Sequence, residues 1–217
     1  MQAFLVEDKY YTLSEVYRCI KDKLPISLSE SVRKKIQSSN EILEDCIKSG
    51  DVIYGLNTGF GKLSQVKISD DDMGSLQRNL IMSHSAGVGD NSSSEIVKIM
   101  MLLKIISLSR GYSGVRMKLI NRIIDFINFD CIPIVPSQGS VGASGDLAPL
   151  SHMSLPLIGL GEIMYDSRQY PSKEILKKLK ISTFELSHKE GLALINGTQF
   201  SSAYGVSSMS RLNDLIK

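Results

Sequence analysis

The sequence predicts a mainly α-helical fold, arranged as a bundle of helices with minor short strands. The first observation is that residues 26–132 contain no proline, so long helices can run there without interruption. The second is a recurring helix-start signature, in which a serine or threonine precedes an acidic residue by three positions. The signature occurs at Thr12/Glu15, Ser27/Glu30, Ser69/Asp72 and Ser92/Glu95. The third is that apolar residues follow at the helical period, which predicts one buried face per helix.

The predicted helices carry apolar faces of two kinds. Single stripes are formed by Val32, Ile36, Leu43 and Ile47, and further along the chain by Val115, Leu119, Ile123 and Ile127. Residues 96–108 are instead apolar nearly all round, which indicates a helix buried inside the bundle. A helix is also expected to begin after Asp146, whose side chain could cap it. Lysines at 177, 178 and 180 are typical of a solvated helix face.

The predicted strands are short and few. Candidates are 52–54, 132–135 and a hairpin over 162–170 that turns at Asp166-Ser167-Arg168. No repeat or low-complexity linker divides the chain, so residues 1–217 are expected to form one unit. The last apolar helical pattern, from Phe200 to Ile216, runs to Lys217 with neither a glycine stop nor a following proline. Either another chain covers this stripe or the natural sequence continues.

Composition and charge exclude several classes of protein. The net charge is +2, without a basic cluster large enough to follow a phosphate backbone, so no nucleic-acid partner is expected. Lys98 and Lys104 interrupt the most apolar stretch, which is too short to span a bilayer, and no secretory signal opens the chain. The three widely spaced cysteines indicate free thiols in a reducing compartment rather than disulfides or a metal site. A cytoplasmic location is expected.

Two glycine-rich loops carry the candidate chemistry. In the first, residues 54–61, three glycines make an adaptable backbone that presents Tyr54, which could act as a general acid or base or could simply pack on the core. The second, residues 138–149, lacks the lysine of a phosphate-binding loop and the spacing of a dinucleotide-binding loop. It also lacks the glycine that would complete a nucleophile elbow, because Asp146 stands there.

The triplet Ala143-Ser144-Gly145 permits a backbone reaction. In a tight turn the amide nitrogen of Gly145 can attack the carbonyl carbon of Ala143, because glycine has no side chain to block the approach. Loss of one water closes a five-membered ring, and loss of a second from Ser144 leaves an exocyclic methylidene. The product would be a strong electrophile. An ordinary turn into a helix is the alternative for the bare triplet.

The surrounding sequence resembles the histidine and aromatic amino acid ammonia-lyases, in which Ala-Ser-Gly becomes a 4-methylideneimidazol-5-one group. Four blocks carry the resemblance in order: 54–61 (YGLNTGFG), 77–87 (QRNLIMSHSAG), 139–153 (GSVGASGDLAPLSHM) and 190–199 (EGLALINGTQ). We refer to them as blocks 1 to 4. The resemblance implies a helical bundle of the aspartase and fumarase type, usually assembled as a homotetramer with active sites shared between subunits.

The resemblance also implies roles for individual residues. Ala143, Ser144 and Gly145 would form the electrophile autocatalytically, with no external cofactor and no metal. Tyr54 would be the base that removes the β-proton of the amino acid. Binding of the substrate falls to Asn196, to the loop around Gly61 and to the pair Ser83 and His84. His152 and His188 receive no catalytic role.

The pair Ser83-His84 bears on substrate choice. In tyrosine- and phenylalanine-specific members of the family a leucine follows histidine or phenylalanine here, whereas Ser-His resembles the histidine-specific form. An imidazole substrate gains from a hydrogen-bonding partner, so L-histidine, giving urocanate, is the favoured substrate. His84 also falls in line with Met73, Leu76 and Leu80, so it could instead be a core histidine with one satisfied nitrogen.

Alternatives and missing parts follow from the same comparison. A tyrosine or phenylalanine lyase or aminomutase would use the same electrophile, and a catalytically incomplete fragment could act only as a helical interaction module. Family members are more than twice as long, and an arginine, a second tyrosine and an acidic residue that they use have no counterpart here. The hypothesis is therefore an N-terminal half, completed by a continuation or by a partner chain. Ile106 stands where relatives carry asparagine.

Overall fold

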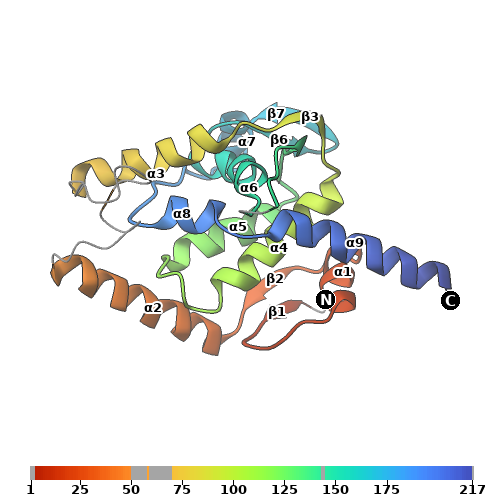
Figure 1. Ribbon diagram of the computed structural model, residues 1–217, viewed down its shortest axis with the longest axis horizontal. Helices are drawn as coiled ribbons and strands as arrows, with labels where there is room; N and C mark the ends of the chain where they lie inside the picture. Colours follow the sequence, from red (N-terminus) through yellow and green to blue (C-terminus); the bar gives the residue numbers. More distant parts are fainter. Residues whose placement is uncertain (1–2, 50–57, 59–69, 143–144, 217) are drawn as a thin grey trace.

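The computed structural model describes residues 3–49, 58, 70–142 and 145–216, and these are mainly helical, as predicted. The helices are α1 (Leu13–Lys21), α2 (Glu30–Ser49), α3 (Asp70–His84), α4 (Ser94–Leu108), α5 (Met117–Asn128), α6 (Leu147–Ser154), η2 (Leu155–Ile158, a 3-10 helix), α7 (Ser172–Lys178), α8 (Glu190–Ile195) and α9 (Gln199–Ile216). They surround α4, which runs through the middle of the molecule (Figure 1).

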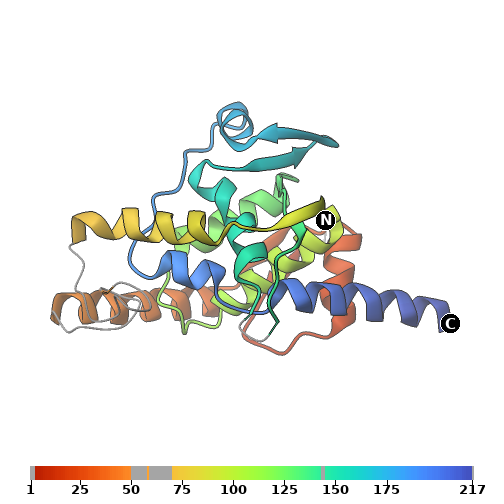
Figure 2. The same ribbon diagram turned by 45° about the horizontal axis from the view of Figure 1, so that its top comes forward.

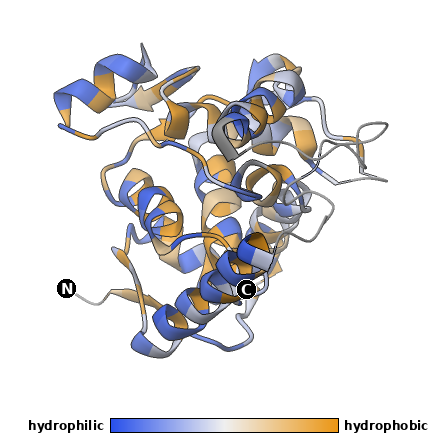
Figure 3. Cartoon of the chain, turned by 90° about the vertical axis from the view of Figure 1, so that its left-hand side faces the viewer, coloured by the Kyte–Doolittle hydropathy of each residue, from blue (hydrophilic) through white to orange (hydrophobic). Residues whose placement is uncertain are grey.

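Helix α4 is the centre of the core. It packs against α1, α5 and α9, and its side chains are buried on nearly every side from Ile96 to Leu108. The all-round apolar pattern predicted this position, because only a helix enclosed by others can bury such a surface. The exposed helices α2 and α5 instead bury one stripe each, which includes Val32 and Ile36 on α2. Hydrophobic segments accordingly face the interior in Figure 3.

The helix starts agree with the sequence in part. Thr12 and Glu15 form the predicted capping box, in which the Thr12 hydroxyl accepts from the Glu15 amide at 3.2 Å and the Glu15 carboxylate accepts from the Thr12 amide at 2.8 Å. The predicted start at Ser27 is wrong, because Ser27 pairs with Leu5 in a strand. Helix α2 begins instead after Ser29, whose hydroxyl accepts from the Val32 amide at 3.3 Å.

The other two predicted starts lie close to the observed ones. Ser93, not Ser92, caps α4 by accepting from the Ile96 amide at 3.3 Å. The Ser92 amide donates to Val135 O instead, so Ser92 belongs to the segment that leads out of a strand. Ser69 lies outside the described residues, and α3 begins directly after it, at Asp70.

The described residues also form three small β-sheets. β1 (Phe4–Val6) pairs in parallel with β2 (Ile26–Leu28), and β3 (Val88–Asn91) pairs antiparallel with β5 (Pro136–Gln138). The third sheet has the order β4 (Ile132–Pro133), β6 (Glu162–Tyr165), β7 (Arg168–Pro171), all antiparallel. The strands of the first two sheets, β1–β2 and β3–β5, show no alternation of apolar and polar residues long enough for them to have been predicted.

The predicted hairpin is confirmed. β6 and β7 are joined by Asp166 and Ser167, whose φ angles of 48° and 60° match the two-residue turn that suits the twist of a hairpin. The strand predicted over 132–135 is shorter than expected and covers only Ile132–Pro133. The candidate strand 52–54 lies outside the described residues.

Helix α9 is buried only along its first half. Phe200, Ala203 and Val206 lie in the core against α4 and α1, whereas Met209 and Leu212 are each 46% exposed. The helix extends beyond the body of the molecule (Figure 2). The later part of the predicted apolar stripe, from Met209 onward, is therefore left without cover by the part of the chain that the structure describes.

Two further properties concern membrane-spanning helices and the thiols. No helix in the described ranges is long and apolar enough to cross a membrane. Cys19, Cys46 and Cys131 carry free thiols. Burial raises the pKa of Cys19 to about 12 and that of Cys131 to about 11, so both side chains behave as small apolar core residues rather than as nucleophiles.

Candidate functional site

The described parts of blocks 2, 3 and 4 come together around the start of α6. Helices α3, α6 and α8 contact one another pairwise, and α9 follows α8 directly (Figure 1). Block 1 lies outside the described residues except for Thr58, which is buried. The predicted residues Tyr54 and Gly61 belong to that block, so no geometry is given for them. Ala143 and Ser144 also lie outside the described residues.

The backbones of blocks 3 and 4 touch at Gly145 and Gly197. The Asp146 amide donates a hydrogen bond to Gly197 O at 2.8 Å. Gly145 has a φ of +103°, and a Cβ placed on it would lie only 2.9 Å from Gly197 O. A side chain at position 145 would therefore strain the backbone and push block 4 away. Glycine at this position is a requirement of the contact.

The backbone at this contact fits the ring-forming chemistry of the triplet. Val141 and Gly145 form an antiparallel bridge, so the described residues on either side of positions 143 and 144 lie next to each other. Such closeness suits ring closure, because the Gly145 nitrogen must approach the carbonyl carbon two residues earlier. The left-handed φ of Gly145 and the absence of a Cβ keep this approach open.

Asp146 does not cap α6 as the sequence predicted. It occupies the N-cap position, but its carboxylate makes no hydrogen bond to the α6 backbone. The fully buried carboxylate accepts from the Ser140 hydroxyl at 2.5 Å, from the Ser201 hydroxyl at 2.6 Å and from the Ser201 amide at 2.8 Å. These donors outcompete a cap, and the carboxylate ties the glycine-rich loop to the start of α9.

Lys104 reaches the same region from the central helix. It is 1% exposed, and its ammonium donates to Asn196 O at 2.8 Å and to Ala193 O at 3.2 Å. Burial lowers its pKa to about 7, and the charge of Asp146 opposes that shift. The sequence reasoning counted Lys104 only as an interruption of an apolar stretch. The signal that could have found it is a lysine in the middle of a stretch that is apolar nearly all round, where no turn of the helix is expected to face solvent.

Asn196 is exposed, and its backbone carbonyl accepts the hydrogen bond from Lys104. It ends α8 as the C-cap residue, and its own amide donates to Leu192 O at 3.0 Å. The amide side chain is thus free to extend from a fixed backbone, one residue before Gly197.

Ser83 and His84 end α3. The His84 Nδ1 lies 2.8 Å from Leu80 O and 3.2 Å from the Ser83 hydroxyl, which itself donates to Leu80 O at 3.0 Å. The ring is half-buried. The helix therefore satisfies one ring nitrogen, as expected of a core histidine, and Nε2 is the nitrogen that could bind a ligand.

The segment after His84 lies against block 3. The Gly87 amide donates to His152 Nε2 at 3.0 Å, and burial lowers the pKa of His152, which favours the neutral ring needed to accept that bond. A Cβ on Gly139 would lie 3.0 Å from the Gly87 Cα. His152 thus positions the end of block 2, a role that the sequence left unassigned. His188 is partly buried.

A buried ion pair holds block 4. The Glu190 side chain is 1% exposed and pairs with Arg116, whose Nε donates to it at 2.8 Å. Glu190 also accepts from the Ser187 amide at 2.8 Å. On the other side, buried Gln77 of block 2 accepts from the Leu192 amide at 3.2 Å. Blocks 2 and 4 are thereby fixed to each other through α3 and α8.

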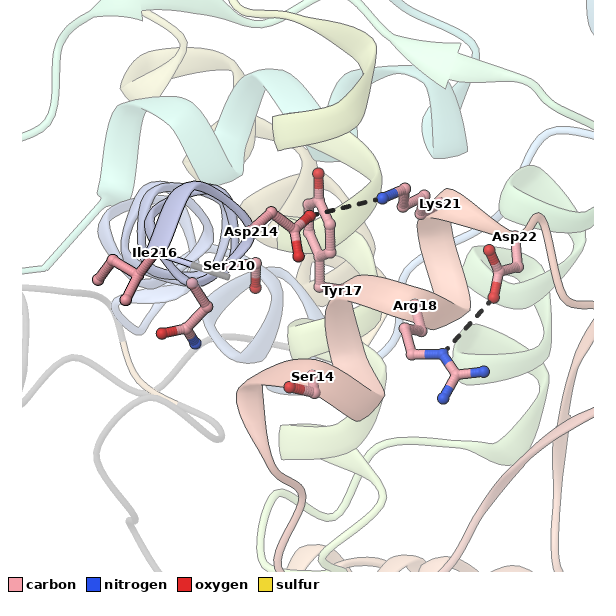
Figure 4. Close-up of a pocket in the computed structure, with 9 residues that line it drawn as sticks. Ser14, Tyr17, Arg18, Lys21, Asp22, Ser210, Asp214 and Ile216 are labelled. Carbon is pink, nitrogen blue, oxygen red and sulfur yellow. Dashed lines mark ion pairs between the residues drawn. The ribbon is translucent and has the colours of Figure 1, made fainter.

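A hollow of about 530 Å³ lies elsewhere, between α1 and α9 (Figure 4). Its charged groups satisfy one another, because Lys21 pairs with Asp214 at 3.6 Å and Arg18 pairs with Asp22 at 3.7 Å. None of its lining residues belongs to blocks 1 to 4. The contact between blocks 2, 3 and 4 is therefore the candidate site, and this hollow is not.

The chain is similar to proteins of one family along nearly its whole length. The family model "aromatic amino acid lyase" matches residues 11–217. Histidine ammonia-lyase of Caldanaerobacter subterraneus subsp. tengcongensis is 45% identical over 205 residues, which are 94% of this chain and 40% of that protein. The corresponding enzyme of Shewanella woodyi is 46% identical over 204 residues, with the same two shares. The chain thus spans about 40% of the length of these relatives.

Solved structures agree on the fold. Histidine ammonia-lyase from Trypanosoma cruzi superimposes with a TM-score of 0.89 at 31% identity, over 97% of this chain and 40% of that one. Phenylalanine aminomutase from Pantoea agglomerans gives a TM-score of 0.90 at 33% identity, over 99% and 42%. The helical architecture is therefore that of proteins with different named activities.

Proposed function

The chain belongs to the aromatic amino acid lyase family, and from that premise we propose that it is the electrophile-bearing part of an enzyme that eliminates ammonia from L-histidine to give urocanate. The observation that carries the proposal is the contact of Gly145 and Asp146 with Gly197, which leaves room only for glycine at the last position of the triplet. The activity belongs to the whole protein, of which this chain supplies the part equivalent to about 40% of a relative.

Formation of the electrophile uses residues of this chain. The Gly145 nitrogen bonds to the carbonyl carbon of Ala143. The carbonyl oxygen leaves as one water with the amide hydrogens of Gly145 and Ser144, and a C=N bond forms between that carbon and the Ser144 nitrogen. The Ser144 hydroxyl leaves with the Cα hydrogen as a second water, which creates the exocyclic double bond. The Gly145 φ of +103° and the bridge between Gly145 and Val141 support closure, because the bridge holds the Gly145 backbone close to the residues that precede the triplet. The resulting 4-methylideneimidazol-5-one group supplies an electrophile that activates the amino acid for loss of ammonia.

The remaining residues bind the substrate or move its proton. Tyr54 is proposed as the base for the β-proton, since a phenol on a glycine-rich loop can approach a bound amino acid. The exposed Asn196 side chain, held at its backbone by Lys104, can donate to the substrate or to the electrophile. The loop around Gly61 is proposed to lie against the bound amino acid.

Substrate choice is assigned to Ser83 and His84. Because the helix carbonyl of Leu80 engages His84 Nδ1, Nε2 is the ring nitrogen that could bind the substrate. A hydrogen bond from that nitrogen to the imidazole of L-histidine has no equivalent in a phenyl substrate. This supports histidine over phenylalanine or tyrosine.

The function is tested by incubating the complete protein, with the continuation or partner that its relatives imply, with L-histidine, L-phenylalanine and L-tyrosine. Ultraviolet absorbance distinguishes urocanate from cinnamate-type products. We expect urocanate from L-histidine and little product from the other two. A cinnamate-type or β-amino acid product without urocanate would assign the protein to the alternative lyases or aminomutases, and no product at all from a folded, fully assembled protein would support an interaction module.

His84→Leu is expected to lower the preference for L-histidine over L-phenylalanine by about 10- to 100-fold in kcat/KM, the scale of one lost hydrogen bond to the substrate. The measurement is the ratio of the two kcat/KM values. Lys98→Met is the control, since Lys98 pairs with Asp130 at 2.5 Å away from blocks 2 to 4, and it should leave the ratio unchanged. An unchanged ratio in His84→Leu would remove His84 from substrate recognition.

A further inference from the structure

We propose that Lys104 is a positioning residue for closure of the ring at 143–145: its ammonium anchors the connector Asn196-Gly197, against which Gly145 and Asp146 are held. The inference rests on the proposed function and adds to it a residue from the central helix α4. Lys104 would thus help to hold Gly145 and Asp146, at the end of the glycine-rich loop, in place for the reaction.

The anchor is a pair of hydrogen bonds at the end of α8. The Lys104 ammonium donates to Asn196 O at 2.8 Å and to Ala193 O at 3.2 Å. Carbonyls at a helix C-terminus lack further helical donors, and this end of a helix attracts a cation. Lys104 therefore satisfies groups that would otherwise be unpaired in the interior, and it fixes where the chain leaves α8.

Gly197 links the backbone held by Lys104 to block 3. Gly197 directly follows Asn196, and its carbonyl accepts from the Asp146 amide at 2.8 Å and limits position 145 to glycine. Gly197 has a φ of +139° and no side chain that could anchor it. The position of its carbonyl depends on the residues on either side, which are Asn196, held by Lys104, and the start of α9, held by Asp146.

Charge strengthens the arrangement. Asp146 is fully buried and accepts from Ser140 and Ser201, so its carboxylate is fixed in place. The charge of Asp146 favours the protonated form of Lys104, against the desolvation that lowers the lysine pKa. A buried ammonium is costly, and an apolar side chain of similar length would fill the same space without that cost. Packing alone therefore does not account for a lysine on α4.

Loss of the anchor should slow ring closure more than it disturbs the fold. A displacement of about 1 Å in a reacting group can cost about 100-fold in rate. Lys104→Met keeps the length and apolar stem of the side chain and removes the ammonium. We expect the loss of two waters after folding to slow by about 10- to 100-fold in this variant.

The experiment compares Lys104→Met with Lys98→Met in the full chain. Lys98 is the matched control, because it lies on the same helix, is 15% exposed and pairs with Asp130 at 2.5 Å, away from blocks 2 to 4. The first readout is hydrogen exchange at the amides of Asp146 and Ser201, which donate to Gly197 O and to the Asp146 carboxylate. The second is the time course of dehydration of the peptide that contains Ser144.

Faster exchange at both amides, by about 10-fold or more, together with slower dehydration in Lys104→Met but not in Lys98→Met, is the expected result. If Lys104→Met exchanges these amides at the wild-type rate, or dehydrates at the wild-type rate despite faster exchange, the role of Lys104 is overturned. The proposed function would then still stand. A wild-type chain that folds but never dehydrates would overturn the proposed function as well, so the two failures are distinguishable. If Lys104→Met does not fold, Lys104→Gln, which keeps a polar donor, decides by the same two readouts.

Discussion

Gly145→Ala is expected to abolish the loss of two waters at residues 143–145 and to lower the free energy of unfolding by about 1–3 kcal/mol. The new Cβ would lie 2.9 Å from Gly197 O, and alanine would have to adopt a φ of +103°. Either the turn opens or block 4 moves, and both separate the Gly145 nitrogen from the carbonyl carbon that it must attack. Peptide mass measures the first effect, and urea unfolding measures the second.

Gly142→Ala is the matched control, since it adds the same methyl group to the same loop. A Cβ at Gly142 meets no atom within 4 Å, and its φ lies outside the left-handed range. We expect this variant to fold as well as the wild type, with any change in unfolding free energy below about 1 kcal/mol. Equal effects of the two substitutions would show that the contact with Gly197 is not what demands glycine at position 145.

Arg116→Met is expected to cost about 3–5 kcal/mol of unfolding free energy, the largest effect on stability that we expect from one side chain. The reason is the partner that remains. Glu190 is 1% exposed and would keep a buried carboxylate without its guanidinium, while Glu185 O would lose a donor at 2.8 Å. Urea unfolding at neutral pH measures the loss.

Two further variants serve as controls for Arg116→Met. Arg116→Met/Glu190→Gln removes the stranded charge and should recover part of the stability, because most of the cost lies in the unpaired carboxylate. Arg211→Met removes an ion pair with Glu95 whose arginine is 64% exposed, and it should change stability little. If Arg116→Met were as mild as Arg211→Met, the Arg116–Glu190 pair would not be what holds α8 in place.

The sequence predicted the elements whose signals are local. The all-round apolar pattern of residues 96–108 predicted the central helix, the Thr12/Glu15 box predicted the start of α1, and the turn at Asp166-Ser167 predicted the hairpin. Each of these is decided by residues within one turn or one helix length. Ser27 was mistaken for a helix start because a serine three residues before an acid is equally compatible with the end of a strand.

The candidate site was predictable in its residue types and not in its connections. Glycine at 145 followed from the ring chemistry, but its contact with Gly197 joins positions 52 residues apart in the sequence, and no local pattern encodes that. Asp146 was expected to cap its own helix, yet Ser201 supplies stronger donors from α9. The role of Lys104 could not be predicted from the sequence, because its acceptors are backbone carbonyls, which every residue carries.

The central claim is that Ala143, Ser144 and Gly145 of this chain form an electrophilic ring, next to the contact of Gly145 and Asp146 with Gly197. The most direct measurement is the mass of the peptide containing Ser144, taken from the purified folded protein and from Ser144→Ala. The account predicts a wild-type peptide lighter by two waters, and a variant peptide that has lost at most one, because alanine has no hydroxyl to eliminate. A wild-type peptide of unmodified mass in a folded, assembled protein would contradict it.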